Sequence, residues 1–157
     1  VNVGFAIAQS LTAGRVDAVM GPFKTYETVQ MRMKGYQTDY FELEQWGIPD
    51  YDELIFVCSK RFAENRSKVL IAFTRAIDKG IAHARAFPKV ALESYFKAVP
   101  EADRRMETEA FELTRPYYAH HQKIVKNRWQ AFADFAWKHG LIEKPVDVAN
   151  IIWKTDK

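Results

Sequence analysis

The order of apolar and polar residues at the start of the chain predicts a strand, a short helix and a second strand. Residues 1–5 and 16–20 are mostly apolar runs of strand length, whereas residues 7–13, which end at Gly14, have helical spacing. A strand, a helix and a strand in this order form a βαβ unit, whose strands are parallel. Open α/β sheets bind ligands at the carboxyl ends of parallel strands, so we expect a cleft near the turn at residues 21–22.

The middle of the chain predicts an extended connection and then an interior strand. Residues 36–52 are rich in aromatic and acidic side chains and are interrupted by Gly47 and Pro49, which favours a crossover between lobes over a helix. Residues 53–58 form a nearly continuous apolar run, which is typical of a strand inside a parallel sheet.

After residue 60 the apolar spacing is helical to the end of the chain. Apolar residues recur at steps of three and four on one helix of about 20 residues; they are Val69, Leu70, Phe73, Ile77, Ile81 and Ala84. Further helices are predicted over residues 88–98, 101–113 and 124–139. We therefore expect an α/β fold that is helix-rich after residue 60. Because nothing precedes the first predicted strand to supply a sheet, we also expect the chain to be a fragment.

Composition and charge exclude several classes of protein. Of 157 residues, 48% are apolar, and 11 Phe, 7 Tyr and 4 Trp exclude an intrinsically disordered chain. The net charge of +3 is spread over both signs, so no nucleic-acid partner is expected. Cys58 is the single cysteine, and the adjacent His120 and His121 lack metal-ligand spacing, so we expect no metal site. No apolar run approaches the length of about 20 residues that spans a bilayer.

Several short motifs, taken in order and spacing, resemble the NMT1/THI5-like family of substrate-binding proteins. The resemblance rests on the segments VGF at 3–5, LTAGRVDA at 11–18, YE at 26–27 and WGIPDYDEL at 46–54, and it continues through 65–91, 129–142 and 145–147. Within that family the chain is most similar to bacterial ABC-transporter receptors for the pyrimidine precursors of thiamine, formylaminopyrimidine or hydroxymethylpyrimidine. The resemblance implies the carboxyl-terminal portion of a two-lobed, type II periplasmic-binding-protein fold.

The same resemblance implies an organisation and a mode of action. Residues 1–38 would belong to the second lobe, residues 39–52 would cross between the lobes, and residues 53–157 would return to the first lobe. The protein would be a receptor rather than an enzyme, with no catalytic residue and no cofactor. Its lobes would close on an aminopyrimidine, and the closed form would dock on the ABC permease in the membrane. It would lie in the periplasm or be lipid-anchored outside the cytoplasm.

Candidate ligand-binding residues follow from the chemistry of an aminopyrimidine, which offers a flat ring and amino donors. Its receptor needs an aromatic plane and a carboxylate. Tyr26 and Glu27 supply both beside the predicted cleft, and the pair resembles a pyrimidine-contacting element of the family. The remaining candidates share the same cleft edge: Phe23, Lys24, Asn2 and Phe5. Structural roles remain open for each, such as an acidic helix start for Glu27 and core packing for Phe5.

Other functions remain open. Eukaryotic relatives of the same fold make the thiamine pyrimidine from their own histidine and pyridoxal phosphate, but they carry a cysteine-rich cluster about where residues 47–52 stand, and this chain has no cysteine there. Sister receptors for sulfonates, nitrate or taurine share the architecture, but the acidic Glu27 disfavours an anionic ligand. A free-standing helical interaction domain is a further alternative, which the βαβ start and the interior strand disfavour.

Overall fold

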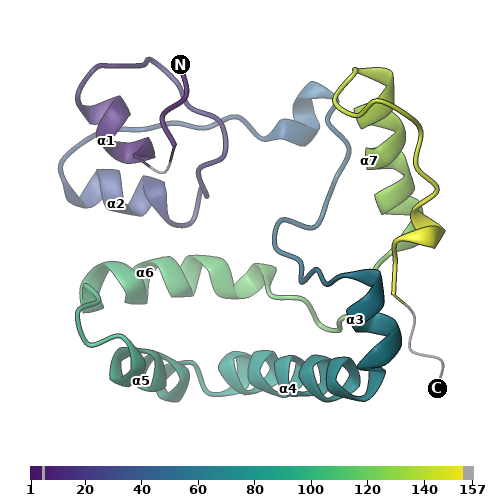
Figure 1. Ribbon diagram of the computed structural model, residues 1–157. Coiled ribbons are helices and arrows are strands. Elements are labelled where there is room, and N and C mark those ends of the chain that lie inside the picture. Colours follow the sequence, from purple (N-terminus) through teal and green to yellow (C-terminus); the bar gives the residue numbers. More distant parts are fainter. Residues whose placement is uncertain (5, 154–157) are drawn as a thin grey trace. The chain divides into compact units, whose positions relative to one another are not determined.

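The computed structural model describes residues 1–4 and 6–153, and in this part of the chain it consists of helices joined by extended and irregular segments (Figure 1). The α-helices are α1 Ile7–Thr12, α2 Glu27–Met33, α3 Lys60–Asn65, α4 Ser67–Ala86, α5 Pro88–Ala98, α6 Arg104–Thr114 and α7 Lys126–Lys138. The 3-10 helices are η1 Leu43–Trp46, η2 Arg115–Tyr117 and η3 Val148–Asn150. Among the described residues, none of these helices is both long and apolar enough to cross a membrane.

The chain divides into two compact units. Unit 1 comprises residues 1–40 and 80–119, and unit 2 comprises residues 41–79 and 120–157. The first boundary lies within the predicted crossover at 39–52, and the second falls inside α4. The division reflects contacts within this chain, so the predicted lobe boundaries stay a prediction.

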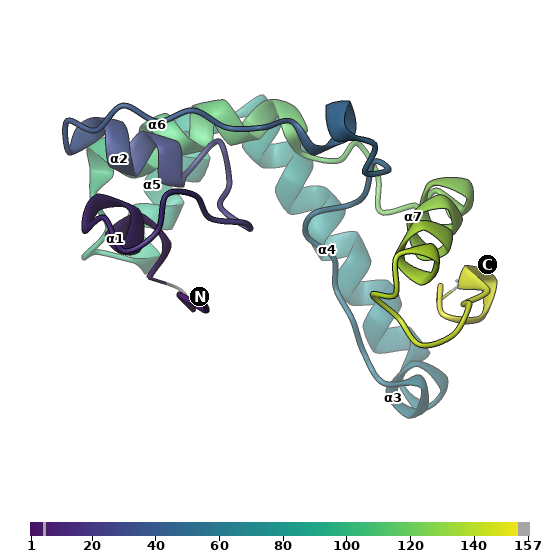
Figure 2. The ribbon, with the colours of Figure 1, turned by 90° about the horizontal axis from the view of Figure 1, so that it is seen from above.

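Unit 1 has a small apolar core between short helices. Helix α2 contacts both α1 and α6, and α5 contacts α6; Figures 1 and 2 both place α2 alongside α6. The buried apolar side chains come from all four helices and are Ala8, Val29, Met31, Leu92, Phe96, Met106 and Ala110. Local signals fix where two of these helices begin. Pro88 occupies the first turn of α5, and Asp103 caps α6 by accepting from the backbone N–H groups of Arg105 and Met106, each at 3.0 Å.

In unit 2, polar contacts join helix α7 to the segment that follows it. Gln130 on α7 donates through Nε2 to the carbonyl of Val146 at 2.9 Å and accepts at Oε1 from the backbone N–H of Val148 at 3.1 Å. These bonds fasten η3 to α7, and Val148 is only 1% exposed. Ala136 is the other buried apolar residue described in this unit.

The predicted helices are confirmed, whereas the predicted α/β class is not. Helices α1 and α4–α7 match the predicted helices, and the chain is helix-rich after residue 60 as predicted. No strand occurs among residues 1–4 and 6–153, so the described parts of the predicted strands at 1–5, 16–20 and 53–58 are irregular or extended. The physical reason is that a strand is held by hydrogen bonds to a neighbouring strand, and an apolar run alone does not supply that neighbour.

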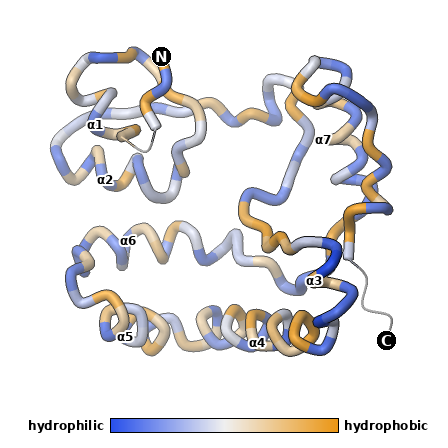
Figure 3. Tube along the Cα trace, viewed as in Figure 1, coloured by the Kyte–Doolittle hydropathy of each residue, from blue (hydrophilic) through white to orange (hydrophobic). Residues whose placement is uncertain are grey.

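The predicted interior strand is exposed, and the predicted apolar stripe of α4 is exposed at Val69 and Phe73 and half-buried at its other positions. Leu54 and Val57 are 83% and 84% exposed, and no residue of α4 is buried. Figure 3 shows the apolar segment that precedes α3 and the apolar positions along α4. Phe56 contacts Phe73 of α4 with ring centroids 4.9 Å apart, so this apolar surface is only partly covered.

Candidate functional site

The loop that precedes α2 carries four of the six candidate residues and is closed by its own hydrogen bonds. The Glu27 carboxylate accepts at Oε2 from the backbone N–H of Phe23 at 2.7 Å, and the backbone N–H groups of Tyr26 and Glu27 donate to the carbonyl of Phe23 at 3.0 and 3.1 Å. The Thr28 hydroxyl donates to the carbonyl of Lys24. Glu27 also begins α2, where the helix dipole favours an acidic side chain. The loop is therefore a defined turn rather than an open strand end.

Tyr26 is directed toward α6. Its hydroxyl donates to Glu107 Oε1 at 2.9 Å, and the ring is half-buried. Burial, together with the hydrogen bond to the Glu107 carboxylate and the charge of that carboxylate, raises the pKa of Tyr26 to about 12. Each effect disfavours the charged phenolate, so Tyr26 stays a neutral phenol at physiological pH.

Lys24 lies between two phenol rings of the same unit. Its Nζ atom is 5.2 Å from the ring centroid of Tyr117 and 5.7 Å from that of Tyr40. These distances are within the range of cation–π attraction. Phe23, in the same loop, is 38% exposed. The loop thus carries one cation that contacts two phenol rings, and one partly exposed Phe, close in sequence to Tyr26 and Glu27.

Asn2 is not placed with this loop. Asn2 Oδ1 accepts from the backbone N–H of Gly4 at 2.9 Å and lines a shallow cavity of about 260 Å³. That cavity is lined by Val1, Asn2, Val3, Gly4, Val16, Ala18, Val19 and Met20. Phe5 lies outside the described residues. The structure therefore brings together Phe23, Lys24, Tyr26 and Glu27, and it places Asn2 in a separate hollow.

Sequence reasoning missed the residues of α6 and η2 that contact this loop. Glu107 bonds Tyr26, the Thr114 hydroxyl donates to that of Thr25 at 2.8 Å, and Tyr117 flanks Lys24. Glu107 is 81 residues from Tyr26. Several acidic residues lie on the same helix, so the sequence offers no signal that selects Glu107.

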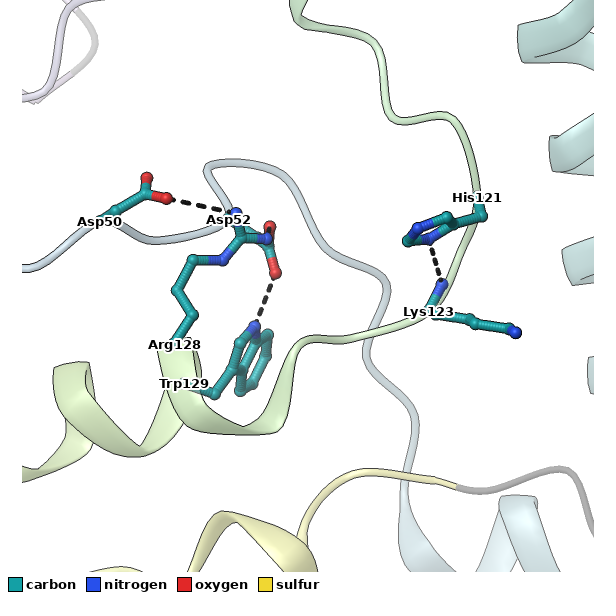
Figure 4. Close-up of polar contacts among 6 residues, drawn as sticks. All are labelled: Asp50, Asp52, His121, Lys123, Arg128 and Trp129. Carbon is teal, nitrogen blue, oxygen red and sulfur yellow. Dashed lines mark hydrogen bonds and ion pairs between the residues drawn. The ribbon is translucent and has the colours of Figure 1, made fainter.

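A second polar cluster, in unit 2, ties the segment that follows Pro49 to α7 (Figure 4). Arg128 pairs with Asp50, with Nη1 and Oδ2 3.3 Å apart, and also with Asp52. Trp129 Nε1 donates to Asp52 Oδ2 at 2.6 Å. Both carboxylates are thus engaged by α7. In Figure 4, His121 and Lys123 contact each other instead, through the Lys123 backbone N–H. This cluster anchors a loop to a helix, and no group of metal-binding side chains occurs among the described residues.

Comparison with known proteins defines the class of the chain. The family model described as NMT1/THI5 like matches residues 1–91. The chain belongs to the NMT1/THI5-like family, which confirms the resemblance in its motifs. The family has a periplasmic-binding-protein fold. No solved structure matches the chain.

Two curated relatives give the family assignment more detail. A protein of Haemophilus influenzae that is named for thiamine biosynthesis is 32% identical over 146 residues, which are 92% of this chain and 46% of that protein. The formylaminopyrimidine-binding protein of Halalkalibacterium halodurans is 36% identical over 80 residues, which are 51% of this chain and 24% of that protein. The chain thus spans about half the length of the first relative and matches about a quarter of the second.

Proposed function

We propose that the protein is the solute-binding receptor of an ABC transporter for a pyrimidine precursor of thiamine. Formylaminopyrimidine is the first candidate ligand, and hydroxymethylpyrimidine is the second. The observation that carries this proposal is the 36% identity to a relative named as a formylaminopyrimidine-binding protein. The relative named for thiamine biosynthesis, which matches 92% of the chain, supports the same ligand class. That the first of these relatives is named as a binding protein favours a receptor over the synthase alternative.

The chemistry of the loop before α2 supports an aminopyrimidine ligand. Tyr26 offers a ring face, and the Glu27 carboxylate offers an acceptor for amino N–H groups. The bond from Phe23 uses one Glu27 oxygen, and a carboxylate has acceptor capacity for several donors. We propose Phe23 and Lys24 as further lining residues of this site, and Asn2 and Phe5 as contributors from the first segment of the chain.

Organisation and location complete the proposal. Residues 1–38 would belong to one lobe, residues 39–52 would form the crossover, and residues 53–157 would return to the other lobe of a two-lobed fold. The ligand would lie in the cleft between the lobes, and the closed receptor would dock on a membrane permease. Family membership supports a periplasmic or lipid-anchored extracytoplasmic location.

The proposal is tested by calorimetric titration of the full-length protein with four compounds: formylaminopyrimidine, hydroxymethylpyrimidine, thiamine and an alkyl sulfonate. We expect one of the two pyrimidine precursors to bind tightest, with little heat from the sulfonate. Tight binding of the sulfonate without binding of either pyrimidine would contradict the ligand assignment and favour a sister receptor.

The role of Glu27 has its own test. Glu27→Gln keeps an oxygen that can accept from Phe23 but removes the charge and replaces one acceptor oxygen with an amino group. We expect the dissociation constant for the pyrimidine to rise about tenfold or more. Glu112→Gln is the matched control, because Glu112 pairs with Arg115 within its own surface turn. Unchanged affinity in Glu27→Gln would assign Glu27 to closing the loop and starting α2 alone.

A further inference from the structure

Three side chains of α6 contact either α2 or the loop that precedes it, residues 23–26, which we call the candidate loop. Glu107 accepts from the Tyr26 hydroxyl at 2.9 Å, Thr114 donates to Thr25 at 2.8 Å, and Glu109 pairs with Arg32 of α2. The two residues that contact Thr25 and Tyr26 are half-buried. All of these residues belong to unit 1. Helix α6 therefore holds the candidate loop through side-chain hydrogen bonds.

Glu107 is held firmly enough to orient the ring of Tyr26. It lies in the first turn of α6, whose start is fixed by the Asp103 cap, and its neighbours Met106 and Ala110 are 8% and 3% exposed. The same carboxylate contributes, after desolvation, to raising the pKa of Tyr95 on α5. Glu107 thus lies near two phenols, one from the loop and one from α5.

We propose that Glu107 is a positioning residue of the binding site: it holds the Tyr26 hydroxyl, so that Tyr26 meets the ligand with its ring face. This inference rests on the proposed function. A phenol has one O–H donor, and here the donor is used by Glu107. The hydroxyl therefore does not serve as a donor to a pyrimidine ring nitrogen, although its oxygen can still accept a hydrogen bond, and Tyr26 would meet the ligand through its ring face. A ring oriented before binding also loses less conformational freedom when the ligand arrives.

The test is a double-mutant cycle in the full-length protein, with calorimetric titration of formylaminopyrimidine as the readout. Glu107→Ala is expected to weaken binding about tenfold, because the ring loses its orienting bond. Tyr26→Phe keeps the ring and loses the same bond, so it should weaken binding to a similar degree. Once Tyr26 is Phe, adding Glu107→Ala should change the affinity by less than about twofold. Additive losses, or an unchanged affinity in Glu107→Ala, would overturn the proposal.

Two further variants separate positioning from general damage to the fold. Glu107→Gln retains an oxygen that accepts from the Tyr26 hydroxyl, so it should recover most of the affinity that Glu107→Ala loses. Glu112→Ala, on the same helix, removes an acid that pairs with Arg115 and should leave the affinity within about twofold. A loss in Glu107→Gln as large as that in Glu107→Ala would contradict a role through this bond.

A spectroscopic measurement keeps the inference distinct from the proposed function. Tyrosinate absorbance, taken as the difference between titrations with and without Tyr26→Phe in each background, follows chiefly the ionisation of Tyr26, with a smaller contribution from the neighbouring Tyr95. Its midpoint of about 12 should fall in Glu107→Ala toward the ordinary value of 10.0. This shift with no binding of any pyrimidine would contradict the proposed function and leave the Glu107–Tyr26 bond established. An unmoved midpoint would contradict the role of Glu107 itself.

Discussion

The two units of the chain are stabilised in different ways. Unit 1 buries seven apolar side chains described in the structure, whereas unit 2 buries two, Ala136 and Val148. In unit 2, side chains of α7 form hydrogen bonds and ion pairs with neighbouring segments, namely Arg128, Trp129 and Gln130, and Phe132 packs against Tyr51. Apolar burial is collective and non-directional, while hydrogen bonds depend on individual partners. The loop that precedes α2 thus belongs to the unit with more buried apolar side chains, and the loss of a single polar residue should matter more in unit 2.

The largest effect is expected from removing a core side chain of unit 1. Phe96 of α5 is 7% exposed, and the Arg104 guanidinium lies 4.2 Å from its ring centroid. Phe96→Ala should lower the free energy of unfolding by about 3 kcal/mol, measured by urea titration followed by circular dichroism. The matched control is Phe41→Ala in unit 2, where Phe41 is 75% exposed and a loss below about 1 kcal/mol is expected. Equal losses would remove the contrast between the units.

A smaller but still measurable effect is expected from one polar residue of unit 2. Asp52 accepts from both Arg128 and Trp129, and Arg128 Nε is buried without a partner among the described residues. Asp52→Asn weakens the ion pair and should lower the free energy of unfolding by about 1–2 kcal/mol in the same urea titration. Asp50→Asn is the control, because the Asp50 side chain is 63% exposed and its pair with Arg128 is screened by solvent. If both variants lose the same amount, the Asp52 contacts do not define unit 2.

The helices were predictable because their signals are local. Helix α5 spans Pro88–Ala98 as the spacing predicts, since proline favours the first turn and the apolar positions repeat at helical steps. The strand predictions failed because a strand needs hydrogen bonds to a second segment, which need not be near in sequence. Residues 53–58 have the composition of an interior strand, yet Leu54 and Val57 are exposed and unpaired with any described strand.

The residues of the candidate site show the same difference between local and distant signals. The pair Tyr26 and Glu27 is adjacent in sequence, so residue chemistry and the family resemblance single it out together. Glu107 is one of several acidic residues on α6, and only the packing of α2 against α6 selects it. A helix pattern predicts the helix, but it does not identify which of its acids meets a distant loop.

The smallest effect, and the one that isolates the link between the loop and the unit 1 core, is a change of stability at high pH. The pKa of Tyr26 is about 12 in the folded protein, whereas its ordinary value, expected in the unfolded chain, is 10.0. The folded state therefore holds the phenolic proton more tightly. The stabilisation is therefore complete below pH 10 and is lost as the pH rises from 10 to about 12. We expect the difference in free energy of unfolding between wild type and Tyr26→Phe to be constant below pH 10 and to shrink between pH 10 and about 12.

Urea titrations at fixed pH measure this difference in free energy of unfolding, and the other tyrosines cancel because both proteins contain them. Tyr117→Phe, which alters a phenol that is 65% exposed, is the control. A difference that does not change between pH 10 and 12 would show that neither burial nor the Glu107 carboxylate favours the neutral form of Tyr26 in the folded state.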